Sequence, residues 1–440
     1  MAAEVEASLP YTVRVRDKLI VLSKDLLQVP GDWPKVARFN AMPDPNRISP
    51  GQVLKIPLSL LKFSAATGRL VSAEGDVQVG GVRATPASAI GEGARLQVGA
   101  NSSAVIELGD GSRIKLLQNS QAEVVSNRLY SIGNSADSAS TNWFSGLMRL
   151  TRGAVEAVAA KSVNRATPLQ ITTPTSVVGV RGTQFRVAFD DPATNNSRSE
   201  VIEGLVRADN PAQQSGAELP QGTGAIINPA QKEVMVVKLL SAPDMTQVPG
   251  ELFKPQGAWP LPSLAGAAAY RVQVAIDEKF DKIVQDQKVT GSTVDLGSLA
   301  TGAWYARVRG IDAVGLEGMD AVKQIAMRER WRTTSSILML VDGRTELAWS
   351  GVQADGRPLI ANSYSVEVAR DQAFTQLVAR TEGERQRLVL GALTAGTYFV
   401  RIHARVDGRL IESDPYTFEL SAGWGVSVFD LPSALRSIPR

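Results

Sequence analysis

The chain has 440 residues, 44% of them hydrophobic, and it contains no cysteine and a single histidine. This length predicts several domains, at roughly 100–200 residues per domain. The lack of cysteine excludes disulfides, thiolate zinc sites and a cysteine nucleophile. One histidine argues against histidine-based triads and the usual zinc sites, so we expect neither an enzyme nor a cofactor or metal. Only a convergent pair of carboxylates would reopen the enzyme hypothesis.

The net charge of +3 is concentrated near the N-terminus, where residues 10–62 carry nine Lys/Arg and four Asp/Glu. An anionic polymer is one partner that this excess fits, and a basic surface kept for solubility is the alternative. No run approaches the ~18–20 apolar residues that cross a bilayer, so we expect no transmembrane segment. The acidic start at residues 1–4 lacks the apolar core of a signal peptide, and we expect that one was removed from an exported chain.

Residues 10–58 predict a small module with the order strand, helix, helix, strand. Residues 11–15 alternate as a strand, and Asp17 precedes leucines at helical spacing, where we expect it to be the N-cap. Trp33-Pro34 begins a second helix, which Asn40 ends. The turn at residues 50–51 leads into a strand over residues 53–56.

This module resembles a lysin motif (LysM). The matching residues are Tyr11-Thr12-Val13, Asp17, Leu19, Trp33-Pro34, Asn40, Asp44-Pro45, Ile48, Pro50-Gly51-Gln52, Leu54 and Ile56-Pro57. The resemblance implies binding of peptidoglycan, through its N-acetylglucosamine glycan, in a cleft between two loops. Those loops are Arg16-Asp17-Lys18, where the family usually has Gly-Asp-Thr, and Arg47-Ile48-Ser49-Pro50. The alternative is that these residues only form turns.

Residues 66–243 predict an all-β domain. A hairpin is expected around Gly109-Asp110-Gly111. Further strand-like runs are residues 147–158, 169–171, 184–189, 201–206 and 234–237.

The most distinctive stretch of this region is residues 171–185, which contain Thr173, Pro174, Arg181, Gly182 and Thr183. It resembles the ectodomain of FecR-type periplasmic regulators, which implies a role in sensing with a membrane partner. Classical members also carry a transmembrane helix and a segment that contacts a sigma factor, and neither is present in this sequence. The Arg-Gly-Thr motif is either an anion or peptide contact or, as we favour, a structural turn.

Residues 250–330 and 335–421 form an internal repeat with a shift of 94 residues. The shift aligns Tyr270 with Tyr364 and Trp304 with Tyr398 within a shared Gly-x-Trp/Tyr-x-x-Arg pattern. Both copies resemble fibronectin type III-like β-sandwiches, with Trp259 and Trp349 expected in their cores. The acidic pair at residues 277–278 is expected in a solvated turn, and the lone histidine, His403, on a strand facing outward or filling an edge. The tail at residues 422–440 has no clear pattern.

We therefore predict a mainly β, multidomain chain: a small βααβ lysin motif, an all-β FecR-like domain and two fibronectin type III-like sandwiches. The predicted function is a non-catalytic cell-envelope protein, exported to the periplasm or envelope, that binds peptidoglycan and uses its β-domains as spacer and interaction surface. Two alternatives remain: a sensor acting with a membrane protein partner, and self-association into a surface fibre or adhesin. Basic residues are not grouped with aromatic ones, so we expect no nucleic-acid partner.

Overall fold

The computed structural model describes residues 7–132, 141–161, 165–180, 182–190, 193–254, 257–353, 356–420 and 427–429. The chain is mainly β and multidomain, and the α-helices of the described residues lie in a short N-terminal segment. Contacts divide the chain into two compact units. The first comprises residues 1–246, 262–292 and 305–323, and the second residues 247–261, 293–304 and 324–440.

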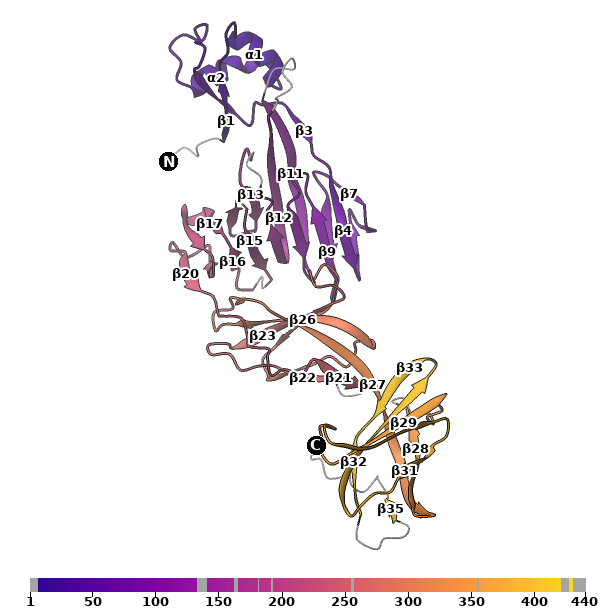
Figure 1. Ribbon diagram of the computed structural model, residues 1–440. Coiled ribbons are helices and arrows are strands. Elements are labelled where there is room, and N and C mark those ends of the chain that lie inside the picture. The colour runs from indigo at the N-terminus through magenta and orange to yellow at the C-terminus, as the bar shows by residue number, and fades with distance from the viewer. Residues whose placement is uncertain are drawn as a thin grey trace. The chain divides into compact units, whose positions relative to one another are not determined.

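The N-terminal module of the first unit has the predicted order of elements (Figure 1). They are β1 (Ser8–Thr12), α1 (Leu19–Leu26), the 3₁₀ turn η1 (Pro30–Asp32), α2 (Trp33–Phe39) and β2 (Val53–Pro57). The strands pair antiparallel, and Leu22, Val36 and Leu54 lie in one apolar core with Tyr130 of the neighbouring domain. The module therefore shares its core with that domain.

Asn40 ends α2, as predicted, and it also joins the helix to β2. Its amide nitrogen donates to the carbonyl oxygens of Val36 (2.9 Å) and Lys55 (2.7 Å), and its amide oxygen accepts from the Lys55 N–H (2.8 Å). One side chain thus satisfies three backbone groups at a helix end.

Replacing Asn40 by alanine should destabilise the N-terminal module by about 1–3 kcal/mol, because three hydrogen bonds are lost and two backbone groups lose partners. Hydrogen exchange of peptides covering α2 and β2 measures this. Asn46→Ala, at an exposed position of the next loop, is the control and should change stability by less than about 0.5 kcal/mol. Equal effects of the two substitutions would contradict the role given to Asn40.

The central β-domain consists of two sheets that share one long strand. The strands β3–β20 are joined by hydrogen bonds into one system of two sheets. The first sheet contains β3 (Phe63–Ala65), β5 (Val77–Val79), β6 (Val82–Arg83), β8 (Arg95–Val98), β11 (Gln121–Ile132), β12 (Thr141–Val158), β13 (Leu169–Thr172), β14 (Val177–Val180), β17 (Leu205–Asn210) and β18 (Ser215–Pro220). The second contains β4 (Gly68–Glu74), β7 (Ala89–Ile90), β9 (Ser103–Glu107), β10 (Arg113–Leu116), the end of β12, β15 (Gln184–Phe189), β16 (Ser197–Glu203), β19 (Thr223–Ile227) and β20 (Met235–Lys238).

Alternating apolar side chains of both sheets fill the space between them and form the core of this domain. The strand β12 passes from one sheet to the other near Gly153, whose φ is +91°. The predicted hairpin is confirmed, with Gly111 in the turn between β9 and β10. The predicted strand over residues 201–206 is wrong: Gly204 (φ +88°) divides it, so that β16 ends at Glu203 and β17 begins at Leu205.

Three strands of the first repeat copy belong to the first unit. They are β23 (Ala269–Ala275), β24 (Ile283–Val289) and the part of β26 (Gly302–Ile311) that follows residue 304. β23 lies between the other two and pairs antiparallel with both. The short apolar cluster of Leu117, Ala188 and Phe280 links these strands to the central β-domain.

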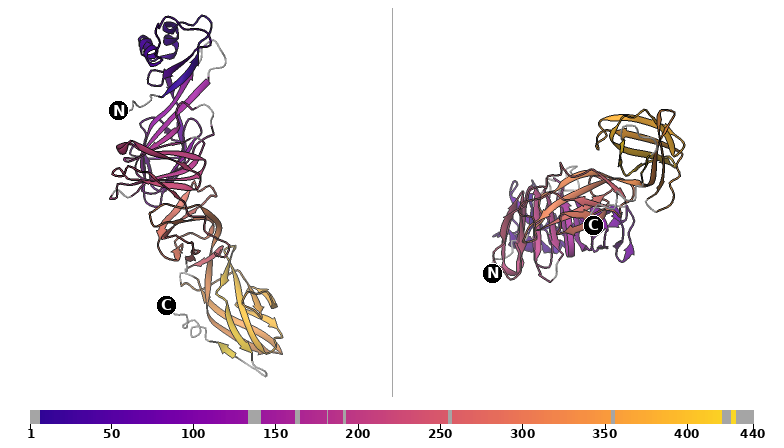
Figure 2. Two further views of the ribbon diagram at one scale, coloured as in Figure 1. Left: turned by 90° about the vertical axis from the view of Figure 1, so that its left-hand side faces the viewer. Right: turned by 90° about the horizontal axis from the view of Figure 1, so that it is seen from below.

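The second unit contains most of the remaining strands, and those from β27 onward are orange to yellow in Figure 2. They are β21 (Glu251–Lys254), β22 (Ala258–Pro260), β25 (Thr293–Asp295), β27 (Ala321–Val341), β28 (Arg344–Val352), β29 (Ser363–Ala369), β30 (Leu377–Gly383), β31 (Arg387–Gly391), β32 (Gly396–Val406), β33 (Arg409–Ser413), β34 (Tyr416–Leu420) and β35 (Ser427–Phe429). The sheet β28–β31 and the sheet β30–β29–β32–β33 are linked by β27 and enclose a core that contains Trp331 and Trp349. Of the tail, residues 427–429 are described, and they pair with β27.

The internal repeat is confirmed in the strand boundaries. The elements β23, β24 and β26 begin 94 residues before β29, β30 and β32, and the bulges at residues 274–275 and 368–369 also correspond. Trp259 and Trp349 are buried, as predicted. Trp304 is only partly buried, but its indole nitrogen donates to the Ala300 carbonyl just as the Tyr398 hydroxyl donates to that of Thr394.

Candidate functional site

The second sheet of the central β-domain has a charged outer face. Along β10, β12, β15 and β16, most residues that point inward are apolar and lie in the core, as Ile114 and Val187 do, with Ser197 and Ser199 of β16 as exceptions. The alternate residues of these strands point outward. Apart from Ala154, Val158, Ala188 and Ile202, the outward residues are charged or polar: Arg113, Lys115, Glu156, Gln184, Arg186, Arg198 and Glu200. In the sequence, such alternation indicates a sheet with one face in contact with water.

In the structure this face is covered by β23, β24 and β26, which bring their own charges. Arg271 of β23 lies directly opposite Arg309 of β26 in the register, an arrangement that is destabilising by itself. Glu317 lies between them, with its carboxylate oxygens 2.8 Å from Arg271 Nη1 and 3.1 Å from Arg309 Nη1. One carboxylate therefore bridges two like charges and offsets part of their repulsion.

Ion pairs continue from these strands into the central β-domain. Glu156 accepts from Arg307 (2.9 Å) and Arg309 (2.7 Å). Arg186 donates to the carbonyl oxygens of Glu317 (3.3 Å) and Gly318 (2.8 Å). We call this set the ion network; its members are Glu156, Arg186, Glu200, Arg271, Gln273, Asp286, Arg307, Arg309, Glu317 and Asp320.

Burial raises the pKa of the carboxyls of the ion network, whereas pairing with arginine lowers it. Burial by itself would raise the pKa of Glu317, but Arg271 and Arg309 hold that pKa far below its ordinary value. Burial is likewise outweighed at Glu156, where Arg307 and Arg309 hold the pKa well below the usual range. At Glu200 burial prevails, and the neighbouring charge of Glu317 helps to raise the pKa of its carboxyl.

These directions predict acid sensitivity of the first unit. Carboxyls with lowered pKa, such as Glu156 and Glu317, stabilise the folded state above the unfolded pKa of 4.5, and this contribution is lost as the pH falls towards their folded values. Glu200 acts oppositely, because its stabilisation is lost as the pH rises from the unfolded to the folded value. The carboxyls with lowered pKa outnumber Glu200, so the unfolding free energy should fall on acidification below about pH 4.5. The fall should be less steep in Glu317→Gln. Urea titrations at several pH values measure both slopes; a pH-independent unfolding free energy would contradict the prediction.

Glu200 and Glu317 form a buried carboxylate pair, the arrangement that an enzyme hypothesis requires. The Glu317 N–H donates to Glu200 Oε1 (3.1 Å), and the two side chains are 2% and 3% exposed. The cavity beside them measures about 10 Å³. Because that space holds at most one water molecule, no substrate reaches the pair, and we assign it a structural role.

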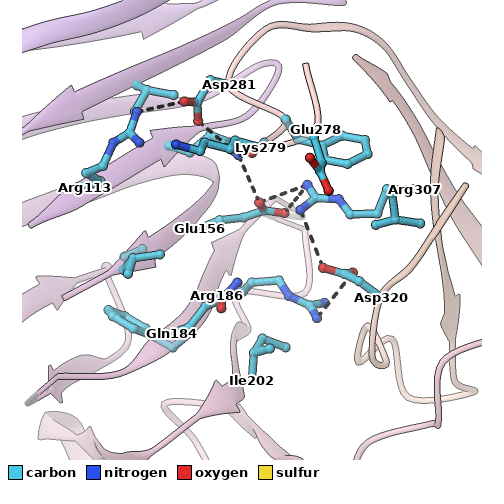
Figure 3. Close-up of a pocket in the computed structure, with 17 residues that line it drawn as sticks. Arg113, Glu156, Gln184, Arg186, Ile202, Glu278, Lys279, Asp281, Arg307 and Asp320 are labelled. Atoms are coloured by element: carbon cyan, nitrogen blue, oxygen red, sulfur yellow. Dashed lines mark hydrogen bonds and ion pairs between the residues drawn. The ribbon is translucent and has the colours of Figure 1, made fainter. Parts of the chain in front are cut away.

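A larger pocket of about 390 Å³ adjoins the ion network (Figure 3). Opposite charges alternate along its wall in the order Arg113, Asp281, Lys115, Glu156, Arg307, Asp320 and Arg186. Apolar side chains, among them Val105 and Phe280, line the rest. The turn at residues 277–281 forms one side of the pocket. Asp277 was predicted to lie in a solvated turn; it does lie in the turn, but its carboxylate accepts hydrogen bonds from the backbone N–H groups of Asp281 and Lys282.

The two loops of the predicted glycan cleft lie at one end of the β1–β2 pair. The Val13 N–H donates to the Gln52 carbonyl and the Gly51 N–H to the Val13 carbonyl, both at 2.8 Å. This pairing places both loops at the same end of the strand pair, since Arg16, Asp17 and Lys18 follow Val13 and Arg47, Ile48, Ser49 and Pro50 precede Gly51. Apart from the half-buried Asp17 and Ile48, these side chains are exposed.

Asp17 does not cap α1 as predicted. The N-cap is Lys18, without a side-chain cap, and Asp17 accepts instead from the Tyr11 hydroxyl (2.8 Å) and the Arg14 N–H (2.7 Å). Burial and this hydrogen bond raise the pKa of Tyr11 to about 12. The carboxylate thus closes the loop before the helix, because Arg16, with φ +74°, turns the chain there.

The Thr-Pro motif forms the turn between β13 and β14. Thr173 Oγ1 accepts from the N–H groups of Thr175 and Ser176, and Pro174 lies within the turn. Gly182 (φ +60°) and the buried Thr183 connect β14 in one sheet with β15 in the other. Gly204 packs on Thr183, where a Cβ would approach the threonine methyl to 2.6 Å. Arg181 lies outside the described residues.

His403 points away from the core residues of its strand and lies 3.4 Å from Glu367. Among the residues that the structure describes, no group of three or more His, Asp or Glu side chains could hold a metal ion. No helix of this described part is long and apolar enough to cross a membrane.

Sequence reasoning missed the ion network, although the repeat contains a signal for it. The 94-residue shift pairs Arg271 with Ser365, Arg309 with His403 and Glu317 with Ile411. These charges therefore occur in the first copy alone, which is the copy whose strands cover the central β-domain. A comparison of the copies for unmatched charges would have identified this face.

Residues 94–207 match the family described as FecR protein. No curated protein matches the chain. Two crystal structures of a candidate anti-sigma factor from Parabacteroides distasonis are similar at 18% identity and a TM-score of 0.25, covering 33% of this chain and 59% of that chain. The FN1–FN3 domains of chicken CNTN1 are similar at 13% identity and a TM-score of 0.21, covering 54% of this chain and 96% of that chain.

Proposed function

We propose that this chain is a non-catalytic signalling component of the bacterial cell envelope, in which the FecR-like domain acts by contacting a membrane protein. The observation that carries the proposal is the match of residues 94–207 to the FecR family. The matched range runs from β8 to β17 and includes β12, the strand that joins the two sheets. The matched range therefore includes the strand that both sheets of the domain share.

The central β-domain also offers a surface for a protein partner. β20 is an edge strand that pairs with β19 within the described part of the chain, and its Met235 and Val236 are 68% and 42% exposed. Leu205, at the start of β17, is 50% exposed. Exposed apolar side chains on a sheet edge favour pairing with another chain.

Coprecipitation from solubilised envelopes tests this proposal. The tagged full chain is compared with Leu205→Asp and Met235→Asp, and with Leu410→Asp as the control, since Leu410 is 59% exposed in the second unit. We expect one membrane-spanning protein to be recovered with the wild type and the control and to be reduced at least about ten-fold by the other two substitutions. Recovery of no membrane protein, or equal recovery with every variant, would count against the proposal.

A second proposal is that the N-terminal module binds peptidoglycan as a lysin motif. It is supported by the βααβ order and by the position of the two loops at residues 16–18 and 47–50 at the same end of the β1–β2 pair. Exposed backbone and short polar groups there fit an acetamido group, and Ile48 and Pro50 fit the apolar face of a sugar. The repeat copies, as fibronectin type III-like domains, would then be spacers. Their shared hydrogen bond from Trp304 or Tyr398 to the carbonyl four residues earlier supports that fold.

Sedimentation with insoluble peptidoglycan tests this second proposal. A chain without the N-terminal module, starting at Ser64, is a poor control. The module shares its core with Tyr130, Ile132 and Trp143, and its removal would expose these side chains to water. Ser49→Trp in the full chain instead fills the cleft at an exposed position, and Ser59→Trp, outside both loops, is the control. We expect only Ser49→Trp to abolish sedimentation. If the wild type remains in solution, the module does not anchor the chain.

A further inference from the structure

The pocket beside the ion network has more cationic than anionic side chains. Arg113, Lys115, Arg186, Lys279 and Arg307 line it, against Glu156, Glu278, Asp281 and Asp320, which leaves an excess of one positive charge. Lys279 and Glu278 are exposed at its rim. The surplus therefore lies among the inner groups, where water screens it least.

The three inner carboxylates of the pocket have guanidinium partners, whereas Glu278 is exposed at the rim. Asp281 lies 2.8 Å from Arg113 Nη2, Glu156 lies 2.7 Å from Arg309 Nη2, and Asp320 lies 2.9 Å from Arg309 Nε. The contact of Asp320 is an ion pair, since its Oδ1 makes no hydrogen bond within the described structure.

The cations of the pocket retain hydrogen-bond capacity. The Lys115 ammonium, in a 9% exposed residue, donates to the Lys279 carbonyl oxygen at 2.8 Å. Its nearest carboxylate oxygens, of Asp281 and Glu156, are at 3.7 and 3.9 Å, beyond hydrogen-bond distance. An ammonium has three donors, so two are left within the described structure. Arg113 adds a buried Nε that has no hydrogen-bond partner among the described groups.

The rest of the pocket is apolar. Val105 and Phe280 are buried at its base, Ile202 is half-buried, and Val158 and Val322 are half-exposed at the opening. Unused cationic donors beside apolar walls complement a molecule with an anionic end and an apolar body. The volume of about 390 Å³ is within the range of small-molecule sites.

We propose that this pocket binds a small amphipathic carboxylate, whose anionic oxygens accept from Lys115 and the free Nε of Arg113 while its apolar body contacts Val105, Phe280 and Ile202. The inference is independent of the protein partner proposed above, because it concerns the isolated chain. An ammonium group accepts no hydrogen bond, and an uncharged hydroxyl accepts from the free donors without charge assistance, so both satisfy the site less well than a carboxylate. The second repeat copy has Ala373 in place of Lys279 and Thr375 in place of Asp281, so it lacks this lining.

Calorimetric titration of the full chain with octanoate tests the proposal, with octan-1-ol and octylammonium as probes of equal chain length. We expect saturable binding of octanoate and at least about ten-fold weaker binding of the other two, as the loss of one charge-assisted hydrogen bond implies. Lys115→Met, which keeps an unbranched apolar side chain but removes the ammonium, should weaken octanoate binding at least about ten-fold. Lys161→Met, which removes an exposed lysine paired with Glu203, is the control and should leave it unchanged.

Arg113→Gln provides a second variant, because the Arg113 side chain is 32% exposed and its replacement leaves the apolar base intact. It should weaken octanoate binding while the thermal unfolding midpoint stays near that of the control. Three results would overturn the proposal: no saturable octanoate binding, equal binding of octanol or octylammonium, or undiminished binding in both pocket variants. None of them bears on the coprecipitation result, so the two proposals fail separately.

Discussion

Replacing Glu317 by glutamine is expected to lower the free energy of unfolding of the first unit by about 3–5 kcal/mol. The side chain is buried and its carboxylate is the shared partner of Arg271 and Arg309, which lie opposite each other on neighbouring strands. Glutamine retains the shape but not the charge. Arg271 keeps Asp286, and Arg309 keeps Glu156 and Asp320, but both lose the carboxylate that bridges them. The cost comes from the less compensated repulsion between the two buried guanidinium groups more than from the lost hydrogen bonds.

Hydrogen exchange in increasing urea, followed in peptides from β10, β23 and β26, measures this effect in the first unit alone. Glu203→Gln is the matched control, because Glu203 pairs with Lys161 at 3.1 Å but is 54% exposed, and it should cost less than about 1 kcal/mol. The double variant Glu317→Gln with Arg271→Gln should lose less unfolding free energy than the two single variants together, by about 1–3 kcal/mol. A loss below about 1 kcal/mol for Glu317→Gln would contradict the role of the ion network.

Gly153→Ala is expected to destabilise the central β-domain by about 3–4 kcal/mol, the sum of a left-handed backbone and an overlap in the core. At φ +91°, its Cβ would lie 2.5 Å from Ser120 Cα. Ser120 cannot withdraw, because its hydroxyl donates to the Ala154 carbonyl and accepts from the Ala154 N–H. The substitution therefore strains the point where β12 passes between the sheets.

Gly111→Ala separates the two causes. Gly111 has a similar φ of +82°, but a Cβ there meets no atom within 4 Å. The control should cost only about 1–2 kcal/mol, from the backbone alone. Urea unfolding followed by circular dichroism gives both values, and equal losses would show that the overlap at Gly153 is relieved without cost.

Much of the fold was predictable, because local patterns determine it. The helix over Trp33–Phe39 followed from its Trp-Pro start and Asn40, and the repeat followed from a single register that reappears in the boundaries of β23 and β29. The errors came from single residues. Asp17 was taken for a cap because of its type, whereas the positive φ of Arg16 directs it to Tyr11 and Arg14.

The ion network was not predictable from strand alternation, since a charged outer face ordinarily indicates contact with water. Nothing in the sequence around Arg186 or Glu156 indicates that strands more than eighty residues later cover them. Only a nonlocal comparison carries the information: Glu317 and Arg309 have no charged counterparts of the same kind in the second repeat copy. The predicted loops at residues 16–18 and 47–50 lie at the same end of the β1–β2 pair, because the strands pair antiparallel, and a glycan cleft between them stays a prediction.

The most direct measurement of the proposed signalling role is photo-crosslinking in living cells. A benzophenone amino acid replaces Leu205 or Met235 on the central β-domain, and Leu410 of the second unit serves as the control; all three are at least half exposed. If the FecR-like domain contacts a membrane protein, we expect a covalent product with one membrane-spanning protein from Leu205 or Met235, and none with that protein from Leu410. If the chain is present in the envelope and neither Leu205 nor Met235 gives a product with a membrane protein, the FecR-like domain does not act through such a partner.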